Sequence, residues 1–182
     1  MSNSFIDTTP RRRKKMKIMN SKSWPIEKLE EINRDEVENK LRVALNLLYK
    51  NDVFLLKRGK ETERGPNERS VSHKLAEYLQ GQFPDWHVDC EYNRHGIKIK
   101  TQECKKVYPD IIIHHRNFDD NLLVIELKTS EDENREDIEK LEGFTYQNGD
   151  YKYRFGVFIR LDDVRTKELL WFEFGQQRNQ ER

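Results

Sequence analysis

Two strongly apolar runs, residues 111–113 and 122–125, lie only eight residues apart and constrain the fold more than any other feature of the chain. Each run is too short for a typical helix and suits a strand that is buried on both faces, as in a sheet covered by helices on both sides. The polar connection at 116–121 is short enough for an antiparallel hairpin. The sequence therefore predicts central strands at about 107–115 and 121–128.

Charged residues stand at the ends of these two runs. Asp110 opens the first run, and Glu126 and Lys128 close the second. A hairpin loop centred on Phe118 places Asp110 opposite Glu126, and a loop centred on Asp119 places it opposite Lys128. Either register puts the three charged side chains on one face, with facing Cβ atoms about 4.5–5.5 Å apart. The hairpin is therefore expected to gather two carboxylates and one ammonium group.

Two carboxylates this close repel each other unless positive charge lies between them. Lys128 could neutralise part of that charge. A divalent cation would neutralise more, because Mg²⁺ is held by one or two carboxylates and keeps positions open for water and phosphate. Such a site suits phosphodiester hydrolysis, in which the cation stabilises a pentavalent phosphorane and Lys128 orients the attacking water. The alternative is a surface salt bridge at two strand ends. The apolar residues Ile112, Leu122 and Val124 on the same face argue against it.

The other elements follow from the spacing of apolar residues. Residues 35–49 place an apolar side chain at every third or fourth position, which predicts an amphipathic helix. A second helix should begin after Pro66, with Asn67 as its N-cap, and end near Leu79. The further predicted elements are a short strand at 53–56, a half-buried strand at 86–92, a helix at 131–147, and strands at 153–161 and 168–174.

These elements give an α/β fold class, with a mixed central sheet flanked by helices. At 182 residues the chain is expected to form one domain with additions. The predicted parts are a disordered basic tail at 1–23, an N-terminal helical addition and loop at 24–66, a core domain at 67–175 and a frayed tail at 176–182. The core has the order helix, strand, strand, strand, helix, strand, with an extra C-terminal strand.

Composition bears on partners and location. Residues 1–22 hold seven Lys or Arg and one Asp, which leaves −5 for the rest of a chain whose net charge is +1. Nucleic-acid binding would therefore depend on a local basic cleft, on metal ions or on the RRRKK tail at 11–15. No apolar run is long enough to cross a membrane, and no signal-peptide pattern is present. Cys90 and Cys104 show no CxxC spacing, so reduced thiols in a cytoplasmic protein are expected.

The charged hairpin resembles a known pattern. Pro109 and Asp110, fifteen further residues, and then Glu126, Leu127 and Lys128 resemble the motif of the PD-(D/E)xK nuclease superfamily. The predicted order of elements over about residues 67–161 is similar to the core of that superfamily, the restriction-endonuclease-like fold. The resemblance implies an endonuclease or exonuclease that uses Mg²⁺, or Mn²⁺ in its place, to hydrolyse phosphodiester bonds in nucleic acid, with DNA as the expected substrate.

The resemblance also implies roles for matching residues. Asp110 and Glu126 would be metal ligands, the backbone carbonyl of Leu127 would add another, and Lys128 would assist the attacking water. Glu68 would match a glutamate that many members carry on the first core helix.

Four of the site residues keep alternatives. Glu68 lies in the first turn of its helix, on the core-facing stripe, where it could equally act as a plain helix cap. Glu91 could lie near the site or be a solvated strand residue. Many superfamily members carry a polar residue that touches the site on the helix after the ExK strand. Lys140 and Gln147 fit that position, and a solvated helix face is the alternative for both.

Other chemistries have little support in the sequence. His114 and His115 are adjacent in a strand and so point to opposite faces, and HxH and HExxH are absent, so zinc is not expected. No phosphate loop, dinucleotide motif or nucleophile elbow occurs.

Two other readings stay open. One is a catalytically inactive nuclease-like fold that binds nucleic acid or a protein. The other is a structural module in which Asp110 and Glu126 point apart or pair with separate cations. A homodimer would suit the cutting of two strands at one place.

Overall fold

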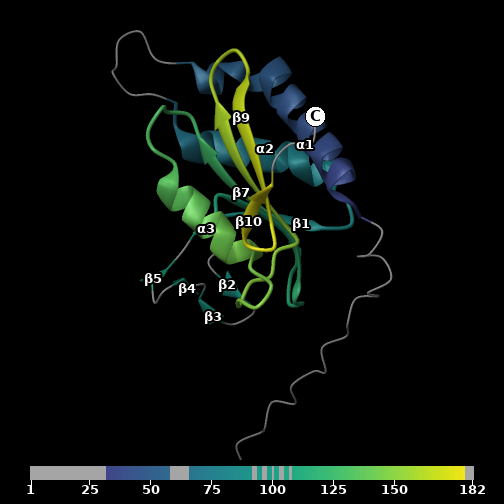
Figure 1. The fold of residues 1–182 in the computed structure, drawn as a ribbon. Coiled ribbons are helices and arrows are strands. Elements are labelled where there is room, and N and C mark those ends of the chain that lie inside the picture. Colours follow the sequence, from purple (N-terminus) through teal and green to yellow (C-terminus); the bar gives the residue numbers. More distant parts are fainter. Residues whose placement is uncertain are drawn as a thin grey trace, which may run out of the picture.

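A six-stranded mixed sheet with helices on both sides forms the centre of the protein (Figure 1). The structure is a computed structural model that describes residues 32–57, 66–91, 94–95, 98–99, 101–102, 105–106 and 108–178. The predicted α/β class and the mixed sheet flanked by helices are confirmed. The basic tail predicted at 1–23, with its RRRKK segment, lies outside the described residues, as does Cys104.

The main sheet has the strand order β1-β6-β7-β8-β9-β10, and only β7 and β8 run parallel. Its strands are β1 His87–Cys90, β6 Ile111–His115, β7 Asp120–Lys128, β8 Phe155–Leu161, β9 Thr166–Glu173 and β10 Gln176–Arg178. Two separate ladders lie between β1 and β6 in the chain. They are formed by β2 Arg94–His95 with β3 Lys98–Ile99, and by β4 Thr101–Gln102 with β5 Lys105–Lys106.

The register of the central hairpin favours one of the two predicted pairings. Ile111 pairs with Ile125, so the next positions along the two strands are Asp110 and Glu126. The register shifts by one residue after Ile113, where a bulge intervenes before the loop. The bulge lies at the far end of the hairpin from the charged residues, so it leaves their relative placement unchanged.

Helices cover both faces of the sheet, as the continuous burial of β6 and β7 requires. Helices α1 (Arg34–Asp52) and α2 (Glu68–Gln82) pack together on one face, and α3 (Arg135–Thr145) covers the other (Figure 1). From Leu123 onward, alternate residues of β7 divide between two apolar clusters. Ile125 packs on the α1 and α2 side, and Val124 packs on the α3 side with Leu141 and Phe144. Glu126 follows the alternation and therefore faces α3.

The structure corrects several predicted boundaries. Residues 53–56, predicted as a strand, form a short 3₁₀ helix that continues from α1. Helix α2 does not end near Leu79 as predicted but runs through Gly81 to Gln82. The segment from 176, predicted to be frayed, begins with β10. This strand pairs with β9 through a two-residue turn in which Phe174 and Gly175 both have positive φ.

Helix α3 approaches the sheet closely at Gly156 on β8. A Cβ at this position would lie 2.9 Å from Thr145 Cγ2 and 3.3 Å from both Leu141 Cδ2 and Phe172 Cβ. The missing side chain therefore sets how closely α3 can pack on the sheet. Within the described residues, no helix has both the length and the apolarity needed to cross a lipid bilayer.

Candidate functional site

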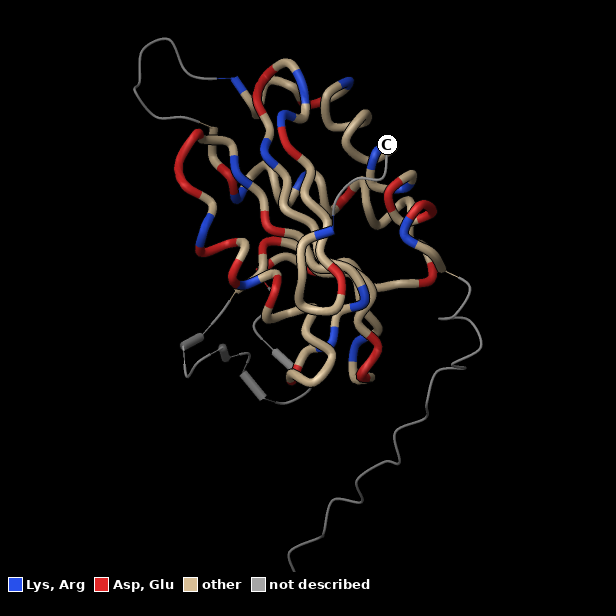
Figure 2. Tube along the Cα trace, viewed as in Figure 1, with Lys and Arg blue, Asp and Glu red and all other residues tan. Residues whose placement is uncertain are grey.

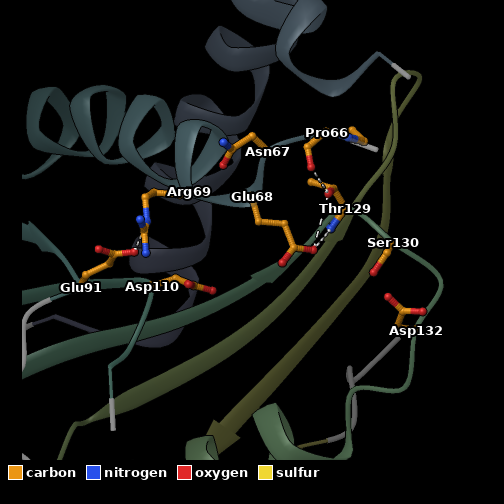
Figure 3. A pocket seen from close by; sticks show the side chains of 9 residues that line it. All are labelled: Pro66, Asn67, Glu68, Arg69, Glu91, Asp110, Thr129, Ser130 and Asp132. Atoms are coloured by element: carbon orange, nitrogen blue, oxygen red, sulfur yellow. Dashed lines mark hydrogen bonds and ion pairs between the residues drawn. The ribbon is translucent and has the colours of Figure 1, made fainter. Parts of the chain in front are cut away.

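An open pocket of about 600 Å³ lies at the end of the sheet where β7 finishes (Figure 3). Its walls come from the start of α2, the end of β1, the start of β6 and the loop that follows β7. The lining residues are Pro66, Asn67, Glu68, Arg69, Glu91, Asp110, Thr129, Ser130 and Asp132. Three of the predicted site residues, Glu68, Glu91 and Asp110, therefore share this pocket.

Asp110 is tied to the strands on both sides of β6, to β7 through its side chain and to the end of β1 through its main chain. Its Oδ2 accepts a hydrogen bond from the Leu127 N–H at 2.7 Å, and its carbonyl oxygen accepts one from the Glu91 N–H at 3.2 Å. Burial raises the pKa of Asp110 to about 6, and the bond from Leu127 offsets part of that rise. Nearby negative charge on Asp137 and Glu68 raises the pKa further.

Glu126 is the most deeply buried of the predicted ligands, with 2% of its surface exposed. Its Oε2 lies 3.3 Å from Lys140 Nζ, whereas its Oε1 is buried and has no hydrogen-bond partner among the described residues. Burial, followed by the charge of Asp110, raises the pKa of Glu126 well above its ordinary value. Because a buried polar oxygen without a partner is costly, this atom marks a place where a cation would be stabilising.

Among the described ion pairs, Lys128 pairs with neither Asp110 nor Glu126. Its Nζ lies 3.2 Å from Asp137 Oδ2 on α3. The other oxygen of that carboxylate, Oδ1, accepts a hydrogen bond from Lys140 Nζ at 2.9 Å. Asp137 was not among the predicted site residues. It stands in a segment with six other acids between 131 and 142, where spacing alone does not distinguish a buried acid from solvated ones.

Glu68 has a structural role that is not the expected helix cap. Asn67 caps α2 instead, since its side-chain oxygen accepts from the Ser70 N–H at 3.3 Å. Glu68 Oε1 accepts a hydrogen bond at 2.8 Å from the Thr129 N–H, directly after β7 (Figure 3). This contact ties the start of α2 to the end of the strand that carries Glu126 and Lys128.

The three site-adjacent predictions have different outcomes. Lys140 reaches Glu126, as described. Glu91 lines the pocket, where its carboxylate pairs with Arg69 (Figure 3). Gln147 lies beyond the end of α3, and its side-chain amide donates to the carbonyl oxygens of Thr145 and Tyr153. It therefore braces the connection to β8 and does not contact the predicted ligands in the described contacts.

The adjacent histidines of β6 have separate partners. His114 Nε2 contacts the Asp89 carboxylate, and His115 Nδ1 contacts that of Asp120. This agrees with the expectation that they do not share one site.

Asp110 joins two environments. Glu68 and Glu91 lie on its pocket side, and Glu126, Lys140 and Asp137 lie on the side of the sheet that α3 covers. Figure 2 shows acidic and basic positions interspersed along α3. In the part of the chain that the structure describes, no three acidic, thiol or imidazole side chains converge as a ready metal cluster. The oxygen donors that fit a cation are two carboxylates and one carbonyl. The N–H and C=O of an extended residue point to the same side, so the Leu127 carbonyl is directed toward Asp110.

Comparison with known protein families finds no family model that matches the chain, and comparison with curated proteins finds no significant match.

Proposed function

We propose that this protein is a metal-dependent nuclease of the PD-(D/E)xK type that hydrolyses phosphodiester bonds in DNA. The observation that carries the proposal is the placement of Asp110 and Glu126 next to the last pair of the central hairpin, with a buried oxygen of Glu126 that has no partner among the described residues. The helix, three strands, helix and strand formed by α2, β1, β6, β7, α3 and β8 are compatible with it. The short strands β2 to β5 are an addition between β1 and β6.

The oxygen donors fit a hard divalent cation such as Mg²⁺ or Mn²⁺. Asp110, Glu126 and the Leu127 carbonyl would hold it, and Glu68, whose Oε1 is bonded to Thr129, could add its other oxygen. One or two carboxylates suffice for Mg²⁺, which retains several waters. When bound, the cation supplies positive charge for the phosphate oxygens and acidifies a coordinated water.

The chain's own residues would hold and orient the reactants. Asp110 is fixed by its bond to β7 before any ligand arrives. Lys128 is held at 3.2 Å from Asp137, on the same face as Glu126, from where its ammonium group can orient the attacking water or balance developing negative charge. The open pocket gives a nucleic-acid backbone access to Asp110.

A cleavage assay tests the proposal. Purified protein should cut plasmid or single-stranded DNA with Mg²⁺ or Mn²⁺, and Asp110→Asn and Lys128→Met should each reduce the rate by at least about a hundredfold. Matched controls are Asp163→Asn and Lys50→Met, which change exposed residues outside the site. Cutting that persists in an Asp110→Ala, Lys128→Ala double variant would come from a contaminating enzyme and would remove the claim.

The second candidate is a nuclease-like fold that binds nucleic acid or a protein without catalysis. It is favoured by the pairing of Lys128 with Asp137 instead of with either predicted ligand. Calorimetry separates the two candidates: binding of Mg²⁺ that Asp110→Asn weakens, together with cleavage, supports the nuclease. DNA binding without cleavage under all metal conditions supports the inactive fold.

A further inference from the structure

Beneath α3, the charged side chains form an alternating chain of contacts. Lys128 contacts Asp137, Asp137 contacts Lys140, and Lys140 contacts Glu126. Lys140 is the link between the two acids: its Nζ lies 2.9 Å from Asp137 Oδ1 and 3.3 Å from Glu126 Oε2. The Lys140 ammonium group is therefore shared between Glu126, which is a proposed metal ligand, and Asp137, which is not.

The two contacts of Lys140 are unequal. Both are hydrogen bonds, and the shorter one is to Asp137, which lies one turn earlier on the same helix. The contact with Glu126 is longer and joins α3 to β7 across the face of the sheet. A small side-chain movement would thus release Glu126 while the ammonium group keeps its stronger partner.

Lys140 is well placed to act as an internal counter-ion. Although burial lowers the pKa of Lys140, the charges of Glu126 and Asp137 raise it above its ordinary range, so the group stays cationic. It is the one cation that contacts Glu126 in the described structure. A divalent cation held by Asp110 and Glu126 would be repelled by an ammonium group at this position.

We propose that Lys140 is the resident counter-ion of Glu126 in the metal-free protein, and that Asp137 alone holds this ammonium group when a divalent cation binds. Lys140 and Asp137 are therefore positioning residues that together set the affinity for the metal. This inference rests on the proposed function, because it needs a metal at Asp110 and Glu126. Beyond that function, the inference states that the divalent cation replaces the Lys140 ammonium group beside Glu126, and that Lys140 and Asp137, both outside the PD-ExK motif, control this replacement.

A thermodynamic cycle tests the exchange. Binding of Mg²⁺ and of Mn²⁺ to the full chain is measured by isothermal titration calorimetry at pH 8.5, where protons compete little. Lys140→Met should bind Mg²⁺ about tenfold more tightly than wild type, since a repelling charge is gone. Asp137→Asn should bind it about tenfold more weakly, because the ammonium group then has only Glu126 as its partner.

The double variant distinguishes this exchange from simple addition of charges. With Lys140 replaced, Asp137→Asn should weaken Mg²⁺ binding by less than about threefold, since no ammonium group needs a place. Asp163→Asn and Lys50→Met are the matched controls and should bind as wild type does. Folding of every variant is checked by its thermal transition, and Lys140→Gln serves if Lys140→Met does not fold.

Three results would count against the inference, and they differ in what else they affect. If wild type binds Mg²⁺ and Mn²⁺ but Lys140→Met binds them no better, or if the two substitutions are additive, the counter-ion role is wrong and the proposed nuclease stands. If wild type binds neither metal, the inference and the proposed function fail together.

Discussion

The Asp110 side chain accepts the Leu127 backbone N–H at 2.7 Å, at the point where pairing between β6 and β7 ends with Ile111 and Ile125. The carboxylate thus accepts an N–H of β7 that would otherwise be accepted by a main-chain carbonyl of the strand paired with it. Its position is consequently set by the sheet and does not depend on a bound ligand. Asp110 also lines the pocket, and burial disfavours the charge of its carboxylate.

Replacing Asp110 should therefore stabilise the metal-free protein. Its folded-state pKa of about 6 lies above the unfolded value of about 3.9, so the penalty of the ionised group is absent below about pH 4 and complete above about pH 6. Asp110→Asn keeps an acceptor for Leu127. It should raise the free energy of unfolding by about 1–2 kcal/mol at pH 7 and by much less at pH 4.

Urea unfolding with a chelator at the two pH values measures this difference, with Asp163→Asn as the control. An equal effect of Asp110→Asn on the unfolding free energy at pH 4 and pH 7 would show that burial does not disfavour the ionised carboxylate.

The structural role of Glu68 can be tested separately from its proposed role as a metal ligand. Glu68→Gln keeps the oxygen that accepts from Thr129, so its unfolding free energy should stay within about 0.5 kcal/mol of wild type, whereas Glu68→Ala should lose about 1–2 kcal/mol. Both substitutions should weaken Mg²⁺ binding if Glu68 is a ligand. Full metal affinity in Glu68→Gln would leave the residue with a structural role alone.

Gly156 should control the distance between α3 and the sheet. Gly156→Ala places a Cβ against Thr145, Leu141 and Phe172 and should cost about 1–3 kcal/mol of stability. Because α3 also carries Asp137 and Lys140, Mg²⁺ affinity should change as well. Gly81→Ala is the matched control: it has open space within α2 and should stabilise by up to about 1 kcal/mol. Thermal unfolding and calorimetry provide both readouts, and a neutral Gly156→Ala would contradict the close packing.

Arg160 should hold the loop between β7 and α3. This arginine is 9% exposed and donates to the carbonyl oxygens of Ser130 and Asp132, which line the pocket. Arg160→Met should cost about 2–4 kcal/mol and speed amide exchange in residues 129–134. Arg135→Met, at a side chain that is 84% exposed, should change stability by less than about 0.5 kcal/mol. Unchanged exchange in the loop would remove this role for Arg160.

The central hairpin could be predicted from sequence because its signals are local. Two continuous apolar runs require cover on both faces, and a short polar connection allows antiparallel pairing. The pairing beside Asp110 matches the first of the two predicted registers, in which Glu126 is the opposite residue. The bulge after Ile113 could not be predicted, since nothing in the composition of the strand marks it.

Contacts between distant elements were harder to predict. Residues 53–56 have a strand-like composition, but they continue α1 as a 3₁₀ helix, and Leu56 is buried against the helices. Asp137 and Arg160 were missed because each looks like an ordinary surface residue in sequence. Their burial depends on the closeness of α3 to the sheet and on the parallel pairing of β7 with β8, which brings Arg160 beside Lys128.

The hydrogen bond from the Glu91 N–H to the Asp110 carbonyl has an evolutionary consequence. It joins the residues that stand on either side of the interval 92–109, at the wall of the pocket. A segment inserted into this interval, or exchanged for it, would start and finish beside the pocket, because Glu91 and Asp110 both line it. The pairing of β1 with β6 would stay intact. Selection for a new target could therefore act on this interval, and the sheet and its acids would be inherited unchanged.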